Sequence, residues 1–124
     1  MAVKLNRSGF SFGKKLVSEG RLVRDEKDAW SEDQPSAEEE NKFIRAHGLK
    51  AFAKWHLGTD MQHPEDTKGR YKFPFGDFSR VHRCAVLSAE SRAGQYKHSD
   101  IERAAARLHE MIDGKNHKVR AAAA

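Results

Sequence analysis

The segment that most constrains the fold is residues 68–114, because its apolar spacing agrees with its helix-start and helix-stop signals along nearly its whole length. Its second half, residues 99–113, repeats apolar side chains at helical spacing, which predicts a helix with one buried face. Ser99 and Glu102 form a capping-box pair before this pattern, and Gly114 follows it. The expected buried face consists of Ile101, Ala104, Ala105, Leu108, Met111 and Ile112.

A second helix is predicted over residues 78–93, directly before the first. Asp77 precedes it as an N-cap and Gly94 follows it, where helices commonly end on glycine. The two helices predict a C-terminal αα-hairpin. A DNA-reading helix-turn-helix is disfavoured, because acidic side chains share the exposed face of the last helix. The connection, about residues 94–98, is also longer than the usual turn of about three to four residues.

The N-terminal half predicts shorter elements around an acidic connector. We expect a helix over residues 8–19 and a short strand over residues 21–24. Residues 25–35 form the acidic connector, in which Trp30 is the one large apolar side chain.

Two more helices are expected after the connector. Ser36 and Glu39 form a capping box that starts the first of them. Apolar spacing predicts the second over residues 49–57. Residues 58–70 have the composition of a long loop, which is either functional or mobile.

Alternating aromatic residues over 71–75 predict a short edge strand, since Pro74 has no N–H to donate to a neighbour. This strand is expected to pair with residues 21–24. The resulting fold class is mainly α: a single compact domain over residues 1–114, with four to five helices, a small two-stranded β element and the C-terminal αα-hairpin. Residues 115–124 are expected to form a disordered tail.

Composition limits the cellular setting. Of the 124 residues, 38% are hydrophobic and 33% are charged, which is polar for a globular domain. No apolar run reaches the roughly 20 residues of a membrane span, and no signal-peptide core precedes the fold. The single cysteine, Cys84, excludes an internal disulfide. We therefore expect a cytoplasmic protein that has no membrane partner.

The net charge of +5 is distributed unevenly. Residues 1–24 hold six Lys or Arg against one acid, residues 25–41 hold eight acids against one Lys, and residues 42–59 hold four bases and no acid. Such banding permits a face that binds a polyanion, and it equally fits charged faces that are merely solvated.

The best candidate site flanks the aromatic strand. Lysine and arginine interleaved with aromatic rings suit single-stranded nucleic acid, since bases stack on rings while cations follow phosphates. The candidate nucleic-acid-binding residues are Arg70, Tyr71, Lys72, Arg80 and Arg83. The alternative places the rings in the core and leaves only the cations exposed.

Catalytic and metal signals are weak. His82 and Cys84 lie two positions apart on the predicted helix 78–93, about 200° around its axis, so they are expected on different faces. No zinc-type spacing of Cys or His occurs, and no metal site or cofactor is predicted. Cys84 in the run C-A-V-L fits a small buried hydrophobe better than a nucleophile. Nucleotide-cradling and serine-nucleophile motifs are missing from the sequence, so no catalytic residue is assigned.

Several strings together, QPSAEEENKFI, KWHLG, KFPFGDFSRVHRC and ESRAGQY, resemble a group of small bacterial proteins of about this length. The resemblance covers roughly residues 15–113. That group has no known activity, so the resemblance implies one compact bacterial domain and carries over no functional residue. The sequence thus predicts a non-enzymatic basic protein that binds a polyanion, most simply nucleic acid. The alternative is a protein-interaction or assembly module that uses Trp30 and Trp55 as exposed aromatics.

Overall fold

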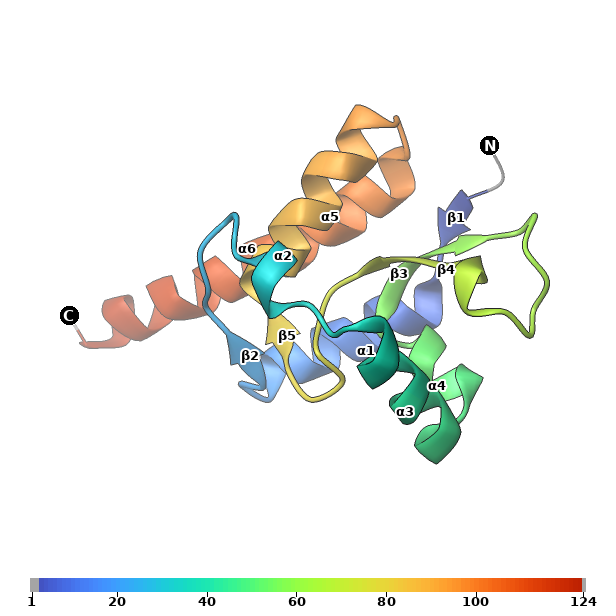
Figure 1. The fold of residues 1–124 in the computed structure, drawn as a ribbon. Coiled ribbons are helices and arrows are strands. Elements are labelled where there is room, and N and C mark those ends of the chain that lie inside the picture. The colour runs from blue at the N-terminus through green and yellow to red at the C-terminus, as the bar shows by residue number, and fades with distance from the viewer. Residues whose placement is uncertain (1–2, 124) are drawn as a thin grey trace.

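The structure, a computed structural model, describes residues 3–123, with the side chains of residues 3–114. In this part of the chain, helices alternate with short strands that form two sheets (Figure 1). The elements are β1 (Val3–Leu5), α1 (Arg7–Ser18), β2 (Leu22–Val23), α2 (Trp30–Asp33), α3 (Ala37–His47), α4 (Leu49–Ala53), β3 (His56–Asp60), a 3₁₀ turn (Lys68–Arg70), β4 (Tyr71–Pro74), β5 (Val81–His82), α5 (Arg83–Gln95) and α6 (Ser99–Ala123). The expected mainly α fold is therefore wrong, because the protein is mixed α/β.

The larger sheet has the antiparallel order β1-β3-β4. Its centre is β3, in which Gly58 lies opposite Leu5 on one side and Lys72 on the other. The smaller sheet pairs β2 with β5 in parallel, with Leu22 opposite Val81. The expectation that residues 21–24 pair with the aromatic strand is wrong, because β4 pairs with β3 and β2 pairs with β5 instead.

The sequence predicts a helix at the start of β3 and a loop over the rest of it, and both predictions are wrong. The helix expected over residues 49–57 ends at Ala53, and the chain is extended from His56 onward. His56, Leu57 and Gly58 are buried, since β3 lies between two other strands and beneath α1. Burial from both sides replaces the period-2 alternation by which a half-exposed strand is recognised.

The helix expected to start at Phe78 starts at Arg83 instead. The Asp77 carboxylate accepts the backbone N–H groups of Ser79 and Arg80, at 3.0 and 2.7 Å, and so caps a turn that leads into β5. Phe78 has φ 72°, which no helix permits. The prediction of Asp77 as a helix N-cap is therefore wrong, because an Asp carboxylate accepts backbone N–H groups in turns as well as at helix starts.

The C-terminal helices form the packed half of the molecule. α5 and α6 run side by side (Figure 1), and Ile101, Leu108 and Ile112 of α6 have no exposed surface. Cys84 is fully buried, as expected. The backbone of α6 continues past Gly114, the expected end, to Ala123; the rest of the expected tail, Ala124, lies outside the described residues. None of the helices in residues 3–123 is both long and apolar enough to cross a bilayer.

Candidate functional site

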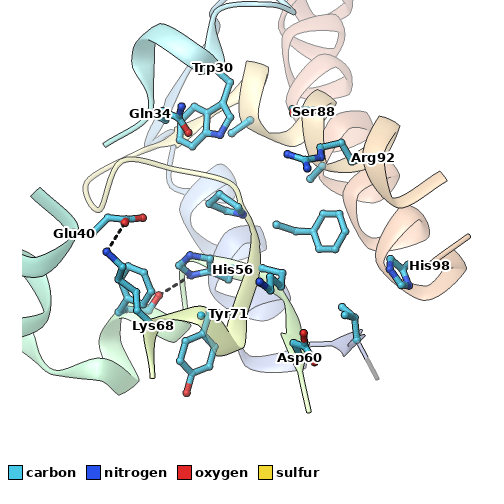
Figure 2. Close-up of a pocket in the computed structure, with 18 of the residues that line it drawn as sticks. Trp30, Gln34, Glu40, His56, Asp60, Lys68, Tyr71, Ser88, Arg92 and His98 are labelled. Carbon is cyan, nitrogen blue, oxygen red and sulfur yellow. Dashed lines mark hydrogen bonds and ion pairs between the residues drawn. The ribbon is translucent and has the colours of Figure 1, made fainter. Parts of the chain in front are cut away.

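An open pocket of about 620 Å³ lies between the larger sheet and the helices α2 and α5. Figure 2 shows how three parts of the chain supply it. Trp30 of α2 lies at one end, Arg92 of α5 lies along one side, and His56 and Tyr71 of the sheet lie across from them. The connector therefore completes one end of the pocket by returning α2 to the face formed by α5 and β4.

Aromatic rings form much of the pocket wall. Tyr71 and Phe73 are two residues apart on β4, the spacing that places side chains on one face of a strand. The backbone at Phe73 has φ 60°, a left-handed conformation that interrupts the alternation of β4, and Lys72 also lines the pocket. The aromatic lining residues are Trp30, Phe52, Tyr71, Phe73 and Tyr96.

Two cations at the pocket have no partner among the side chains that the structure describes. Lys68 is bound by Glu40, with Nζ 3.0 Å from Oε1. By contrast, no ion pair or side-chain hydrogen bond among residues 3–114 involves Lys72 of β4 or Arg92 of α5. These two charges, supplied by different elements of the lining, are therefore available to an anionic ligand.

His56 contributes no charge to the pocket. Its imidazole is 3% exposed, and its Nδ1 lies 2.9 Å from the carbonyl oxygen of Phe52. Burial lowers the pKa of His56 to about 4, despite that hydrogen bond. The ring is therefore neutral at neutral pH and forms part of the apolar floor.

The structure separates the residues that the sequence groups into one nucleic-acid site. Tyr71 and Lys72 line the pocket. Arg70 folds onto its own loop and donates from Nη1 to the His63 carbonyl oxygen at 2.6 Å. Arg83 pairs with Asp113 of α6 at 3.1 Å, and the exposed Arg80 lies in the turn before β5. Only Tyr71 and Lys72 are brought together at the pocket.

Sequence reasoning missed the other half of the pocket. Ser88 and Arg92 are four positions apart on α5 and so share a helix face, but the sequence does not say which structure that face meets. Trp55, expected as an exposed aromatic, is only 4% exposed and packs against Phe12 and Phe75. Trp55 therefore cannot be an exposed contact, and only Trp30 remains for the alternative of a protein-interaction module.

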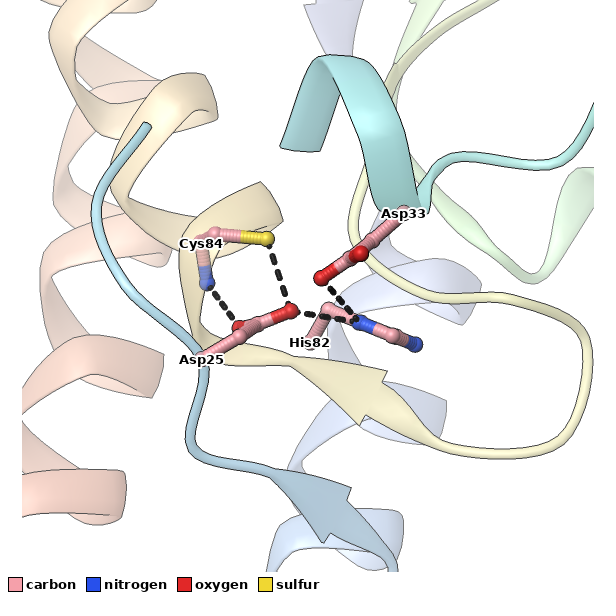
Figure 3. Close-up of side chains that lie close together, drawn as sticks. All are labelled: Asp25, Asp33, His82 and Cys84. Carbon is pink, nitrogen blue, oxygen red and sulfur yellow. Dashed lines mark hydrogen bonds and ion pairs between the residues drawn. The ribbon is translucent and has the colours of Figure 1, made fainter. Parts of the chain in front are cut away.

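A second feature is the polar cluster of Asp25, Asp33, His82 and Cys84 (Figure 3). Asp25 binds two members of it: its Oδ2 lies 2.7 Å from His82 Nδ1 and 2.9 Å from Cys84 Sγ. Its Oδ1 accepts the backbone N–H of Cys84 at 2.8 Å. Asp33 lies at the edge, with Oδ2 4.0 Å from His82 Nδ1.

The parallel pairing of β2 with β5 assembles this cluster. Val23 lies opposite His82, so the chain leaving β2 carries Asp25 alongside Cys84, and α2 then returns Asp33. His82 is the last residue of β5 and Cys84 the second of α5. The expectation that these two side chains point to different faces assumed that both lie on one helix, and it is wrong for that reason.

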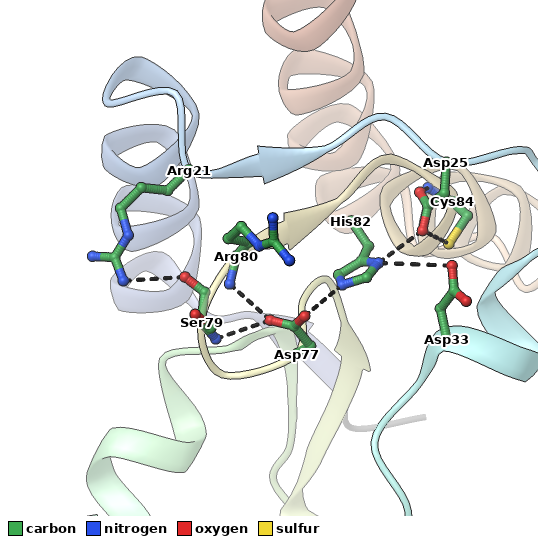
Figure 4. Close-up of polar contacts among 8 residues, drawn as sticks. All are labelled: Arg21, Asp25, Asp33, Asp77, Ser79, Arg80, His82 and Cys84. Carbon is green, nitrogen blue, oxygen red and sulfur yellow. Dashed lines mark hydrogen bonds and ion pairs between the residues drawn. The ribbon is translucent and has the colours of Figure 1, made fainter.

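The other nitrogen of His82 has its own acceptor. His82 Nε2 lies 2.7 Å from Asp77 Oδ2, and Asp77 is itself held by the turn before β5 (Figure 4). Burial opposes the charged imidazole, but the carboxylates of Asp77 and Asp25 outweigh burial and raise the pKa of His82.

The same contacts set the protonation states of the Asp25 carboxyl and the Cys84 thiol. Burial opposes the charge of Asp25, yet hydrogen bonds from Cys84 and His82 outweigh it and lower the pKa of this carboxyl. Burial and the neighbouring Asp25 carboxylate raise the pKa of the Cys84 thiol. A protonated, buried thiol is a poor nucleophile, so the cluster lacks the activated cysteine of a thiol enzyme.

No protein-family model, curated protein or solved structure matches this chain. Its function therefore has to be inferred from the chemistry of the pocket and the polar cluster.

Proposed function

We propose that the protein is a non-enzymatic nucleic-acid-binding protein that holds a single strand in the aromatic pocket. The observation that carries this proposal is the pair of unpartnered cations, Lys72 and Arg92, in a pocket of about 620 Å³ lined by aromatic rings. Bases stack on aromatic rings regardless of sequence, while cations follow the phosphates, and both groups are needed in one groove.

The proposal assigns roles within the pocket. Tyr96 is 54% exposed at the pocket and offers a ring on which a base stacks. Lys72 and Arg92 contact phosphates on either side of that base. Of the residues expected from sequence, Tyr71 and Lys72 keep their roles. Arg70 and Arg83 take minor ones, because each is engaged within the protein.

Two observations support binding rather than catalysis. The single thiol, Cys84, is buried and does not line the pocket. The one buried imidazole that lines the pocket, His56, is neutral and bonded to a backbone carbonyl, so it has little capacity to move protons. In the described part of the chain, the Ser88 hydroxyl of the pocket lining has no side-chain hydrogen bond to a base that could activate it.

The test is a fluorescence titration of labelled single-stranded and duplex oligonucleotides at two salt concentrations. We expect the single strand to bind more tightly than the duplex. Lys72→Ala and Arg92→Ala should each weaken binding and reduce the salt slope by about 0.7. Tyr96→Ala should weaken binding by about 1–3 kcal/mol and leave the slope unchanged.

The matched controls are Lys15→Ala and Arg103→Ala, which remove exposed cations outside the pocket lining. They should bind like the wild type. A triple variant, R70A/R80A/R83A, tests the wider site expected from sequence. No single-strand binding at low salt, or equal losses in pocket and control variants, would refute the pocket as the binding site.

A further inference from the structure

We propose that Asp25, Asp33, His82 and Cys84 bind one zinc ion, at a site distinct from the nucleic-acid pocket. One ligand atom from each of these side chains lies within 4.8 Å of every other. Figure 3 shows the four side chains converging from the connector, α2, β5 and the start of α5. None of these four ligands lines the pocket, and zinc binding is measured without nucleic acid, so the two proposals are tested separately.

The donor set selects the type of metal. A cluster of carboxylates alone would favour Mg²⁺ or Ca²⁺, which prefer oxygen ligands. Here a thiol and an imidazole accompany two carboxylates, and sulfur and nitrogen donors favour Zn²⁺. Four ligands from the protein match the usual coordination number of a structural zinc site.

The distances fit a tetrahedral ion after small movements. Zn–N and Zn–O bonds of about 2.0 Å place the two donor atoms about 3.3 Å apart at the tetrahedral angle. Asp25 Oδ2 lies 2.7 Å from His82 Nδ1, which is shorter than this separation. Asp33 Oδ2 lies 4.0 Å from the same nitrogen, which is longer. The Asp25 Oδ2 to Cys84 Sγ distance of 2.9 Å would open to about 3.5 Å. Side-chain torsions alone supply shifts of this size.

The surroundings orient the ligands as in known metal sites. Ligating histidines generally donate their second N–H to a carboxylate, which fixes the ring and makes it a better donor. Asp77 has this position, with Oδ2 2.7 Å from His82 Nε2, so that Nδ1 is directed at Asp25 and Asp33 (Figure 4). The Trp30 ring packs on the His82 ring at 5.5 Å and limits the entry of water.

Charge favours a divalent cation at this place. Asp25, Asp33 and Asp77 surround a single imidazole, and a cation would offset the excess of negative charge. Zinc binding requires the Cys84 thiolate and an unprotonated His82 Nδ1, so the thiol proton and the Nδ1 proton both leave to solvent as the Zn–S and Zn–N bonds form. The side chains of His82 and Asp25 are 8% and 10% exposed and that of Asp33 is 36% exposed, so the ion enters past Asp33.

The bound ion would tie the connector to the packed half of the molecule. Asp25 and Asp33 lie on either side of the connector's middle, and His82 and Cys84 lie at the junction of β5 and α5. Zinc would thus hold residues 25–33 in place, and with them α2.

The first experiment titrates zinc chloride alone into the full chain after removal of metals with a chelator, and follows heat by calorimetry. We expect one zinc per chain. Asp33→Asn should weaken zinc affinity at least tenfold while circular dichroism stays unchanged, because Asp33 is exposed and its loss leaves no buried group unpaired. Asp28→Asn is the matched control: it removes the same charge from an exposed position outside the cluster, and its affinity should equal that of the wild type.

The second experiment replaces zinc with Co²⁺ and records the absorption spectrum. A thiolate-to-cobalt charge-transfer band and intense tetrahedral d–d bands are expected, and Cys84→Ser should abolish the former. Absence of saturable zinc binding, equal affinity in Asp33→Asn and the wild type, or a cobalt spectrum without a thiolate band would each overturn the proposal. Oligonucleotide binding is measured separately, so failure of the zinc site does not bear on the pocket.

Discussion

The hairpin of α5 and α6 and the connector of residues 25–35 are held in place by opposite means. The hairpin joins neighbours in sequence through buried apolar side chains such as Leu108 and Ile112. The connector has no buried residue and is fixed by polar contacts, chiefly those of Asp25 with His82, 57 positions away. A local pattern therefore encodes the hairpin, whereas the connector depends on partners that its own sequence does not reveal.

The largest effect is expected in the hairpin. Leu108→Ala should lower the free energy of unfolding by about 2–5 kcal/mol, because Leu108 has no exposed surface and its loss leaves a cavity. Urea denaturation followed by circular dichroism measures this change. Arg103→Ala, on the exposed side of the same helix, should stay within about 0.5 kcal/mol. Equal midpoints for Leu108→Ala and the wild type would show that the hairpin is not the apolar anchor.

Acid should act strongly on β3, outside the hairpin, because the titratable side chain of His56 is buried there. Burial lowers the pKa of His56 in β3 to about 4, from 6.5. Between these values the unfolded chain binds a proton that the folded protein does not, so stability falls as the pH drops. The full loss is on the order of 3 kcal/mol once the pH is below about 4.

The measurement is the free energy of unfolding in urea at several pH values across that window. His56→Gln removes the titrating group and retains an amide that can donate to the Phe52 carbonyl oxygen. Its stability should vary less with pH than that of the wild type. A parallel pH dependence in the two proteins would place the acid-sensitive group elsewhere.

The difference between hairpin and connector also explains what the sequence could predict. The stripe through Leu108 and the capping box at Ser36 are contained within one element each, and the structure confirms both. β3 was missed because its burial between two strands removes the alternation on which strand prediction relies. The start of α5 was misplaced because the Asp77 signal suits a turn as well as a helix.

The residues of the candidate sites also differ in whether a local sequence pattern could reveal them. Tyr71 and Lys72, which the sequence groups together, both line the pocket because they are neighbours on β4. Arg92 faces the pocket only through the packing of α5, and Asp25 reaches Cys84 only through the pairing of β2 with β5. Contacts between residues this far apart leave no periodic trace in a single sequence.

A smaller effect than that of Leu108→Ala is expected for Asp25→Ala in the connector. The substitution leaves the Cys84 N–H and one His82 nitrogen without their acceptor, which costs about 1–3 kcal/mol. Denaturation in the presence of a chelator removes any contribution of bound metal, and Asp28→Ala serves as the control. If Asp25→Ala destabilises more than Leu108→Ala, the polar contacts of the connector, and not the apolar hairpin, dominate stability.

The smallest effect is expected in α3, the helix that follows the connector. It tests whether the capping box at the start of α3 contributes to stability. α3 has no buried side chain, so it depends on its ends more than α6 does. Ser36 Oγ accepts the Glu39 N–H at 3.1 Å, and Glu39 Oε1 accepts the Ser36 N–H at 3.0 Å. Ser36→Ala should therefore destabilise by about 1 kcal/mol.

Asn is as good an N-cap as serine, so Ser36→Asn should restore the stability that Ser36→Ala loses. Ser91→Ala, at an exposed position within α5, controls for the loss of a hydroxyl without a cap. The measurement is again urea denaturation, together with the helical signal in circular dichroism. If Ser36→Ala, like the control Ser91→Ala, is as stable as the wild type, α3 is positioned by contacts such as the stacking of Phe43 on Phe78, with ring centroids 4.4 Å apart, and not by its cap. In that case the region after the connector, like the connector itself, would be placed by partners distant in sequence.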